Sequence, residues 1–159
     1  MPRKTINRQV KEPPLFDIFK PRGVAVQKNE FIIMNLDEFE AIRLADYLGL
    51  DHKESSLEME ISRSTFSRLI TRARKKLARL IIEGKQLKID GGQVHFRQNI
   101  YECHSCGHKF KMSIQEEVKT CPSCGSRNLF DLAGGFGHGR CCSNHSQHRG
   151  KGRGRGKRS

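Results

Sequence analysis

The sequence lacks the apolar material for a single large hydrophobic core. Only 35% of its 159 residues are hydrophobic, and there is no Trp. A chain of this length can form one domain or two small ones, and so small an apolar fraction favours two small modules.

Long apolar runs are also missing. No stretch is long enough to span a bilayer, and the first residues, MPRKTINRQV, contain no apolar signal-peptide region. Neither end carries a lipidation motif. We therefore expect a cytoplasmic protein with no membrane partner.

Acidic residues are too few to balance the basic ones. There are 17 Asp and Glu against 30 Lys and Arg, which gives a formal net charge of +13. Such a charge favours a polyanionic partner, and without a membrane-inserting segment nucleic acid is the better candidate. The sequence also lacks a Ser-His-Asp set, a phosphate-binding loop, an open metal site and a paired-carboxylate pattern, so we predict no enzymatic activity.

Residues 1–35 show no helical pattern. Pro13, Pro14 and Pro21 interrupt a mixture of basic and apolar residues, and proline removes a backbone donor and breaks helices. We predict an extended basic arm here.

Residues 36–83 predict three helices. Asp37 with Glu40 has the spacing of a capping box, and Gly49 is a suitable end for the first helix. Asp51 with Glu54 repeats the capping signal and opens a short second helix that runs to about Met59.

The third helix is predicted over residues 63–82, after a tight turn at Glu60 and Ile61 and a cap at Ser62. Its apolar residues recur at three- and four-residue steps, which predicts a buried face made of Phe66, Leu69, Ile70, Ala73, Leu77, Leu80 and Ile81.

The rest of this helix is basic and carries no acid from residue 61 to residue 82. An ordinary solvated helix mixes both signs, whereas hydroxyl side chains in the first turns followed by cations suit base edges and then phosphates of duplex DNA. The predicted DNA-binding residues are Arg63, Ser64, Thr65, Ser67, Arg68, Thr71, Arg72, Lys75, Lys76 and Arg79.

Residues 84–97 predict a hairpin linker with its turn at Asp90-Gly91-Gly92. The segment 98–132 then contains two C-x-x-C-G motifs separated by fourteen residues, a spacing typical of a zinc ribbon. The predicted ligands of one structural Zn²⁺ are Cys103, Cys106, Cys121 and Cys124. Iron in a rubredoxin-like site is the alternative ion, and a redox dithiol is disfavoured because two pairs occur together.

Residues 133–159 predict a disordered tail rich in Gly, Arg and His. From residue 134 on there are seven Lys or Arg and no acid, so the tail can attract phosphates without reading sequence. Its remaining metal-ligand types, which could form a second site, are His138, Cys141, Cys142, His145 and His148.

Four segments resemble a known family. They are FKPRGVAV (19–26), LDEFEAIRLADYLGL (36–50), ISRSTFSRLITRARKKLA (61–78) and GKQLKIDGG (84–92). They are similar to uncharacterised protein family 0251, also called domain of unknown function 134. The resemblance covers about residues 1–92 and implies a prokaryotic, nucleoid-associated protein with a helix-turn-helix like region four of bacterial sigma factors. The cysteine motifs and the tail are additions to that domain.

The fold class that we predict is α plus a small β part. A winged-helix-like or sigma region-four-like helix-turn-helix is followed by a β zinc ribbon and a disordered basic tail. The predicted function is sequence-specific binding of double-stranded DNA in transcription regulation, with a homodimer as one arrangement. Two alternatives stay open: an RNA-associated protein that uses the tail, and a metal sensor or store that uses its Cys and His residues.

Overall fold

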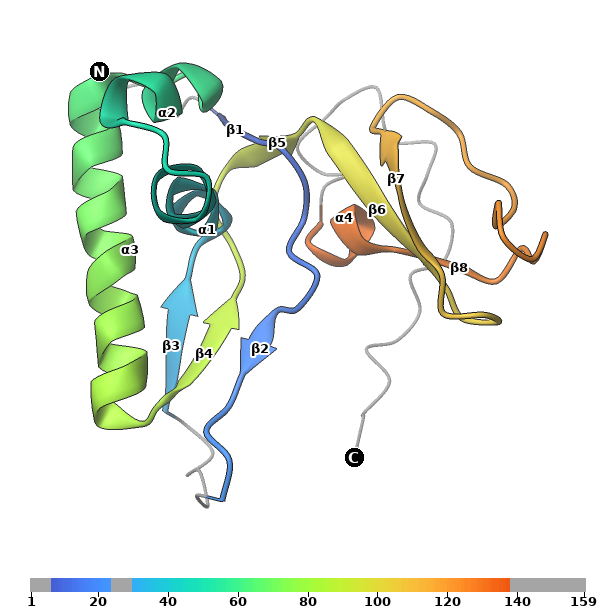
Figure 1. Cartoon of the computed structure of the whole chain (residues 1–159), viewed down its shortest axis with the longest axis horizontal. Coiled ribbons are helices and arrows are strands. Elements are labelled where there is room, and N and C mark those ends of the chain that lie inside the picture. Colours follow the sequence, from blue (N-terminus) through green and yellow to red (C-terminus); the bar gives the residue numbers. More distant parts are fainter. Residues whose placement is uncertain (1–6, 24–29, 138–159) are drawn as a thin grey trace.

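A computed structural model describes residues 7–23 and 30–137 of the chain (Figure 1). Three short strands lead into the helices, and five more strands and a short helix follow them. In chain order the elements are β1 (Arg8–Val10), β2 (Ile18–Phe19), β3 (Phe31–Met34), α1 (Leu36–Ile42), the π-helix η1 (Arg43–Tyr47), α2 (His52–Glu58), α3 (Arg63–Glu83), β4 (Gln86–Ile89), β5 (Val94–Phe96), β6 (Gln98–Cys103), β7 (Lys109–Ser113), β8 (Leu129–Asp131) and α4 (Leu132–Gly135). The three predicted helices are therefore present.

Capping residues explain where the helices begin. Asp51 and Glu54 form the predicted reciprocal cap of α2, since each side chain accepts from the backbone N–H of the other residue. Ser62 accepts from the N–H of Thr65 at the start of α3. The predicted cap at Asp37 is wrong: the cap of α1 is Asn35, which is extended and whose N–H donates to Glu38.

The residues on either side of the helices form one small sheet. Its strand order is β2-β4-β3, with β3 parallel and β2 antiparallel to β4. The predicted hairpin over 84–97 is wrong, because β4 and β5 lie in different sheets. The turn at Gly91 and Gly92 instead meets the start of α1, where the N–H of Leu36 donates to the Gly91 carbonyl at 3.0 Å.

The arm predicted over residues 1–35 is extended in its described part, and its strands pair with later parts of the chain. Residues 8–10 pair in parallel with β5, and the strands β2 and β3 both pair with β4. Val10 is fully buried. Strands β1 and β3 therefore complete the core of the helical part, because their buried Val10, Ile32 and Met34 cover surface that the helices leave open.

Two apolar clusters lie inside the helical part. One joins Ala41 and Leu44 to Met59 of the α2–α3 turn and to Phe66, Leu69 and Ile70 of α3. The other lies between the strands and the second half of α3, where Leu77 and Leu80 pack. Ile81 was predicted to be buried but is 76% exposed, and the buried face of α3 ends with the partly buried Leu77 and Leu80.

The cysteine-bearing part contains a three-stranded antiparallel sheet of order β7-β6-β8 (Figure 1). The short helix α4 returns from β8 to the helical part, where Ala133 is buried and Phe136 packs near Phe96. Residues 133–137 thus belong to the folded part and not to the predicted tail. The tail's metal-ligand candidates, His138 and the Cys and His residues after it, lie outside the described residues.

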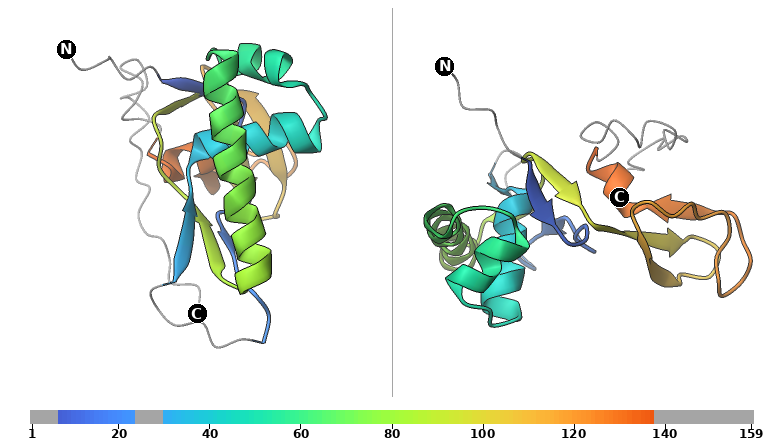
Figure 2. Two further views of the ribbon diagram at one scale, coloured as in Figure 1. Left: turned by 90° about the vertical axis from the view of Figure 1, so that its left-hand side faces the viewer. Right: turned by 90° about the horizontal axis from the view of Figure 1, so that it is seen from above.

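The right-hand view in Figure 2 shows the cysteine-bearing part to one side of the helical part. Lys11 and Glu12 connect the two parts: the N–H of Gln98 donates to the Lys11 carbonyl, and Lys111 pairs with Glu12 at 3.0 Å. In the described ranges, no helix is long and apolar enough to cross a membrane.

Candidate metal centre and nucleic-acid interface

The two C-x-x-C-G motifs fold into the same turn. In the first, the N–H of Gly107 donates to the Cys103 carbonyl at 2.8 Å, and in the second the N–H of Gly125 donates to the Cys121 carbonyl at 2.9 Å. Both glycines adopt a left-handed conformation, with φ of 76° and 72°. Each turn therefore directs its two thiols to the same side.

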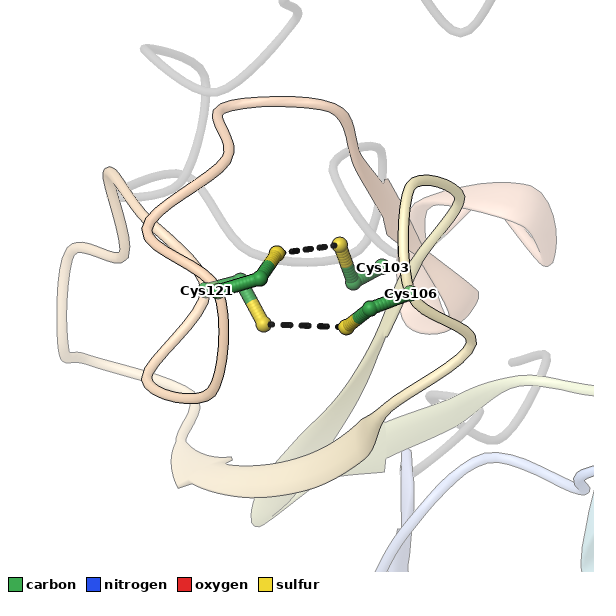
Figure 3. A group of neighbouring side chains, drawn as sticks. Cys103, Cys106 and Cys121 are labelled. Carbon is green, nitrogen blue, oxygen red and sulfur yellow. Dashed lines mark hydrogen bonds between the residues drawn. The ribbon is translucent and has the colours of Figure 1, made fainter.

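The two turns face each other across a small space (Figure 3). The labelled side chains Cys103, Cys106 and Cys121 point toward one another, and all four sulfur atoms lie within 4.8 Å of one another. The Cys103–Cys124 and Cys106–Cys121 sulfurs are 3.6 and 3.8 Å apart. Four thiolates at about 2.3 Å from a tetrahedral Zn²⁺ would be about 3.8 Å apart, so the thiols fit such an ion.

Without a cation the thiols of the cluster do not ionise alike. Burial disfavours the Cys103 thiolate, but N–H groups of Cys106 and Ser105 donate to its sulfur, and the pKa of Cys103 falls to about 6. At Cys124 the N–H of Ser126 lowers the pKa, while the Cys106 thiol and burial raise it, and it reaches about 12. A bound cation stabilises all four thiolates together.

The arrangement has four protein ligands and no further metal-ligating group in the described cluster. A tetrahedral ion held this way has no open position for a substrate, so the chemistry of the donor set suits a structural ion. Tetrahedral sulfur coordination suits iron as well as zinc. The structure therefore supports a four-cysteine metal site, as the spacing predicted.

The second candidate site is the outward face of α3. Seven of the predicted DNA-binding side chains are exposed, and three are half-buried. The exposed ones are Arg63, Ser64, Arg68, Thr71, Arg72, Lys75 and Arg79, and the half-buried ones are Thr65, Ser67 and Lys76. The helix thus exposes most of the predicted residues, while their contact with DNA stays a prediction.

Several of these side chains already have partners within the protein. The ammonium of Lys76 donates to buried Glu38 at 2.6 Å, and Arg72 lies 4.0 Å from the same carboxylate. Arg79 pairs with Glu83 one turn later. By contrast, no hydrogen bond or ion pair in the described part of the chain engages the side chains of Arg63, Arg68 or Lys75.

His52 is a residue that the sequence reasoning missed. Its Nδ1 lies 2.8 Å from the Ser67 hydroxyl, and its ring packs edge-on against Phe66. It therefore fixes the position of Ser67 on α3 from the start of α2. A single His after a helix cap carries no sequence signal for this contact, because residue 67 is fifteen positions away.

Comparison with known proteins identifies the family. The model of "Protein of unknown function DUF134" matches residues 1–97. The chain belongs to this family. A UPF0251 protein of Chloroherpeton thalassium is 47% identical over 132 residues, which are 83% of this chain and 87% of that protein. A UPF0251 protein of Pelotomaculum thermopropionicum is 40% identical over 79% of this chain and 95% of its own length. No solved structure matches.

The extent of these matches corrects one expectation. The DUF134 model ends at residue 97, but the similarity to the Chloroherpeton thalassium protein covers 132 residues and therefore continues at least 35 residues further. That length reaches into the cysteine-bearing part. Similarity within the UPF0251 relatives is thus not limited to the helical part, and the cysteine-bearing part is not wholly an addition to it.

Proposed function

We propose that this DUF134 protein binds double-stranded DNA in a sequence-specific manner through α3 and takes part in transcription regulation. The observation that carries the proposal is the single-signed outward face of α3. Seven cations and no acid lie between residues 61 and 82, and most of them are exposed. A face of this kind attracts phosphates along the length of a DNA groove.

The connection between α2 and α3 supports a helix-turn-helix. Glu60 adopts a positive φ of 54°, and the N–H of Ile61 donates to the Ser56 carbonyl at 3.0 Å, so the chain reverses within a few residues. Met59 is fully buried beside Phe66, which fixes the second helix against the third. In such a motif the second helix of the pair enters the major groove.

The distribution of partners along α3 suggests a division of roles. Arg68 lies in the first turns, is exposed and is free of ion pairs in the described chain, so its guanidinium can reach a guanine edge. Lys75 lies two turns later and also has no ion-pair partner in the described chain, so its ammonium suits contact with a phosphate. Lys76 is held by Glu38 and contributes to the packing of α3 on α1 instead.

We further propose that the four thiols bind one structural Zn²⁺. The metal would hold the β6–β7 turn and the segment before β8 together, since few apolar residues connect them. Metal analysis of purified protein identifies the ion. One zinc per chain is the expected result. One iron per chain, with the visible absorption of an iron–thiolate site, would show that the ion is iron and contradict the assignment of zinc.

The DNA-binding proposal is tested by selection of genomic fragments with the full-length protein, followed by titration of the selected duplex. We expect tighter binding of the selected duplex than of random duplex, and weaker binding of RNA with the same sequence, at about 150 mM salt. The exposed Lys119, in the cysteine-bearing part, provides a control: Lys119→Ala should leave affinity unchanged while Arg68→Ala lowers it. Equal or tighter binding of the RNA would contradict the proposal.

A further inference from the structure

Four of the predicted DNA-binding side chains of α3 carry hydroxyl groups, and three of these hydroxyls are held by residues close to them in the chain. The Oγ of Ser62, the cap of α3, lies 3.2 Å from the Ser64 hydroxyl and 2.7 Å from the Thr65 hydroxyl. The Thr71 hydroxyl donates to the Ser67 carbonyl at 2.8 Å. These contacts join residues two to four positions apart, so they form within α3 and its cap alone.

The fourth hydroxyl, that of Ser67, is held from a different helix. It lies 2.8 Å from Nδ1 of His52, which is the first residue of α2, and α2 lies beside the first half of α3 (Figure 1). The His52 ring meets the ring of the fully buried Phe66 edge-on, with the centroids 5.4 Å apart. Because Phe66 fixes the ring and the ring fixes the hydroxyl, the orientation of Ser67 depends on the packing of the two helices.

The contact with His52 leaves Ser67 able to bind a further group. A serine hydroxyl has one donor hydrogen and two acceptor lone pairs, and the imidazole uses one of these. The side chain is half-buried, whereas Ser64 and Thr71, one turn away on either side, are exposed. Ser67 is therefore restricted in its rotation but still accessible, which is the combination that selective recognition of a hydrogen-bonding group requires.

The place of Ser67 along α3 favours a base edge over a phosphate as that group. Ser67 lies in the second turn of α3, directly before the exposed Arg68. The first turns of a recognition helix contact base edges, whereas later side chains hold phosphates. A neutral hydroxyl also gains less from the charge of a phosphate than a cation does, but an oriented one distinguishes the donor and acceptor atoms of the major groove.

We propose that His52 is a positioning residue that orients the Ser67 hydroxyl toward a base edge in the major groove, so that the pair determines part of the sequence specificity. This inference rests on the DNA binding proposed above. It extends that function to α2, because one contact of α3 is then set by a residue outside α3. A purely structural His52, which only packs α2 on α3, would instead affect the binding of all duplexes alike.

A double-mutant cycle on the full-length protein tests the coupling, with the selected duplex and random duplex as probes. Ser67→Ala and His52→Ala should each weaken binding of the selected duplex about fivefold, as for one neutral hydrogen bond, and change binding of random duplex little. The double variant should also lose about fivefold rather than about 25-fold, because His52 acts through Ser67. The control is Leu57→Ala, since Leu57 is 68% exposed on the same helix and should not affect either affinity.

Two further variants of His52 keep the test decisive if loss of the ring weakens the fold. The amide of His52→Asn takes the place of Nδ1 and can bond to Ser67, whereas the longer amide of His52→Gln takes the place of Nε2. We expect His52→Asn to regain most of the affinity that His52→Ala loses, and His52→Gln to regain little. A urea titration shows whether each variant is folded at the binding temperature.

Losses that multiply in the double variant overturn the proposal, because the two residues then act independently. So do equal losses of His52→Ala on both duplexes, an unchanged affinity of Ser67→Ala, or equal affinities of the Asn and Gln variants. If the unsubstituted protein does not distinguish the two duplexes, sequence-specific DNA binding fails and this inference fails with it. A protein that prefers the selected duplex but gives any of the earlier results contradicts only the role of His52.

Discussion

At the scale of single residues, the cations of α3 fall into two groups. Lys76, Arg74 and Arg79 have acidic partners, of which Glu38 is buried, whereas Arg68 and Lys75 have no ion-pair partner in the described chain. A cation already held by a carboxylate gains less from a phosphate than a free one, because the first pair must be broken. The free cations should therefore dominate DNA binding.

Arg68→Ala and Lys75→Ala should change DNA binding in different ways. Loss of Arg68 should cost about 1 to 3 kcal/mol on the selected duplex and little on random duplex, as expected for a guanine contact. Loss of Lys75 should weaken both duplexes alike and reduce the salt slope by about one. Titrations of both variants on both duplexes over a range of salt concentrations measure the affinity losses and the salt slopes. Equal losses on both duplexes for Arg68→Ala would assign it to phosphate contact.

Glu38→Gln should lower stability rather than act directly on DNA binding. Glu38 is 3% exposed and accepts from Lys76 and from the N–H of Asn35, so the substitution leaves the Lys76 ammonium without its counter-charge. We expect a loss of about 2 kcal/mol in the free energy of unfolding, measured by urea titration. The matched control is Glu83→Gln, whose exposed pairs should contribute nothing measurable. Equal losses for both variants would show that burial of Glu38 does not matter.

At the scale of elements, the cysteine-bearing part is attached to the helical part by more than the chain. Ala133 and Phe136 after β8 pack into the core beside Phe96, and Lys111 pairs with Glu12. We expect the folding of β6, β7 and β8 to depend on the two cysteine turns, which lie between these strands. A metal bound at these turns should therefore stabilise the helical part, although only through the contacts of Ala133, Phe136 and Lys111.

Cys121→Ser should abolish metal binding and partly loosen the core. We expect metal content to fall from one per chain to none and amide protection to be lost in β6–β8. The free energy of unfolding of the helical part should fall by about 1 to 2 kcal/mol, because Ala133 and Phe136 no longer pack against it. Amides of α3 from Phe66 to Ala73 should stay protected. The exposed Ser123, in the same turn, supplies a control, since Ser123→Ala should keep the metal. Metal retained by Cys121→Ser would contradict the four-thiol site.

At the scale of the whole molecule, net positive charge is concentrated in residues 138–159 and in α3. Residues 138–159 contain seven Lys or Arg and no acid, so they supply +7 of the net +13. By contrast, residues 98–137 contain four basic and four acidic residues and are formally neutral. We therefore expect general attraction to polyanions to come mainly from the end of the chain and from α3, and none from the cysteine-bearing part.

Deletion of residues 138–159 should separate general attraction from sequence reading. The remaining protein carries 13 − 7 = +6, so its affinity for random duplex should fall, most strongly at low salt. The salt slope should fall by about 0.9 for each phosphate that the tail no longer neutralises. Preference for the selected duplex should survive, because α3 is unchanged. Salt titrations of both proteins on both duplexes provide the measurement. A truncated protein that binds random duplex normally but no longer prefers the selected one would place sequence reading in the tail.

Features that depend on neighbouring residues could be predicted from the chain alone. The caps at Asp51 and Ser62, the end of α3 at Gly84 and the two cysteine turns follow from side chains and backbone angles within a few positions. The apolar period of α3 predicted most of its buried face for the same reason. The metal site was predictable because each pair of thiols is set by one short turn.

Strand pairing and the exposure of surfaces depend instead on the tertiary structure. Arg8 pairs with Val94 and Ile32 with Leu87, and no local pattern specifies partners so far apart in the chain. The Asp90-Gly91-Gly92 turn predicted a hairpin because its backbone suits one, yet it contacts the start of α1 instead. Exposure of Ile81 and Ile33, which are 76 and 45% exposed, depends on which elements pack nearby, and the hydrophobicity of a sequence does not specify that packing.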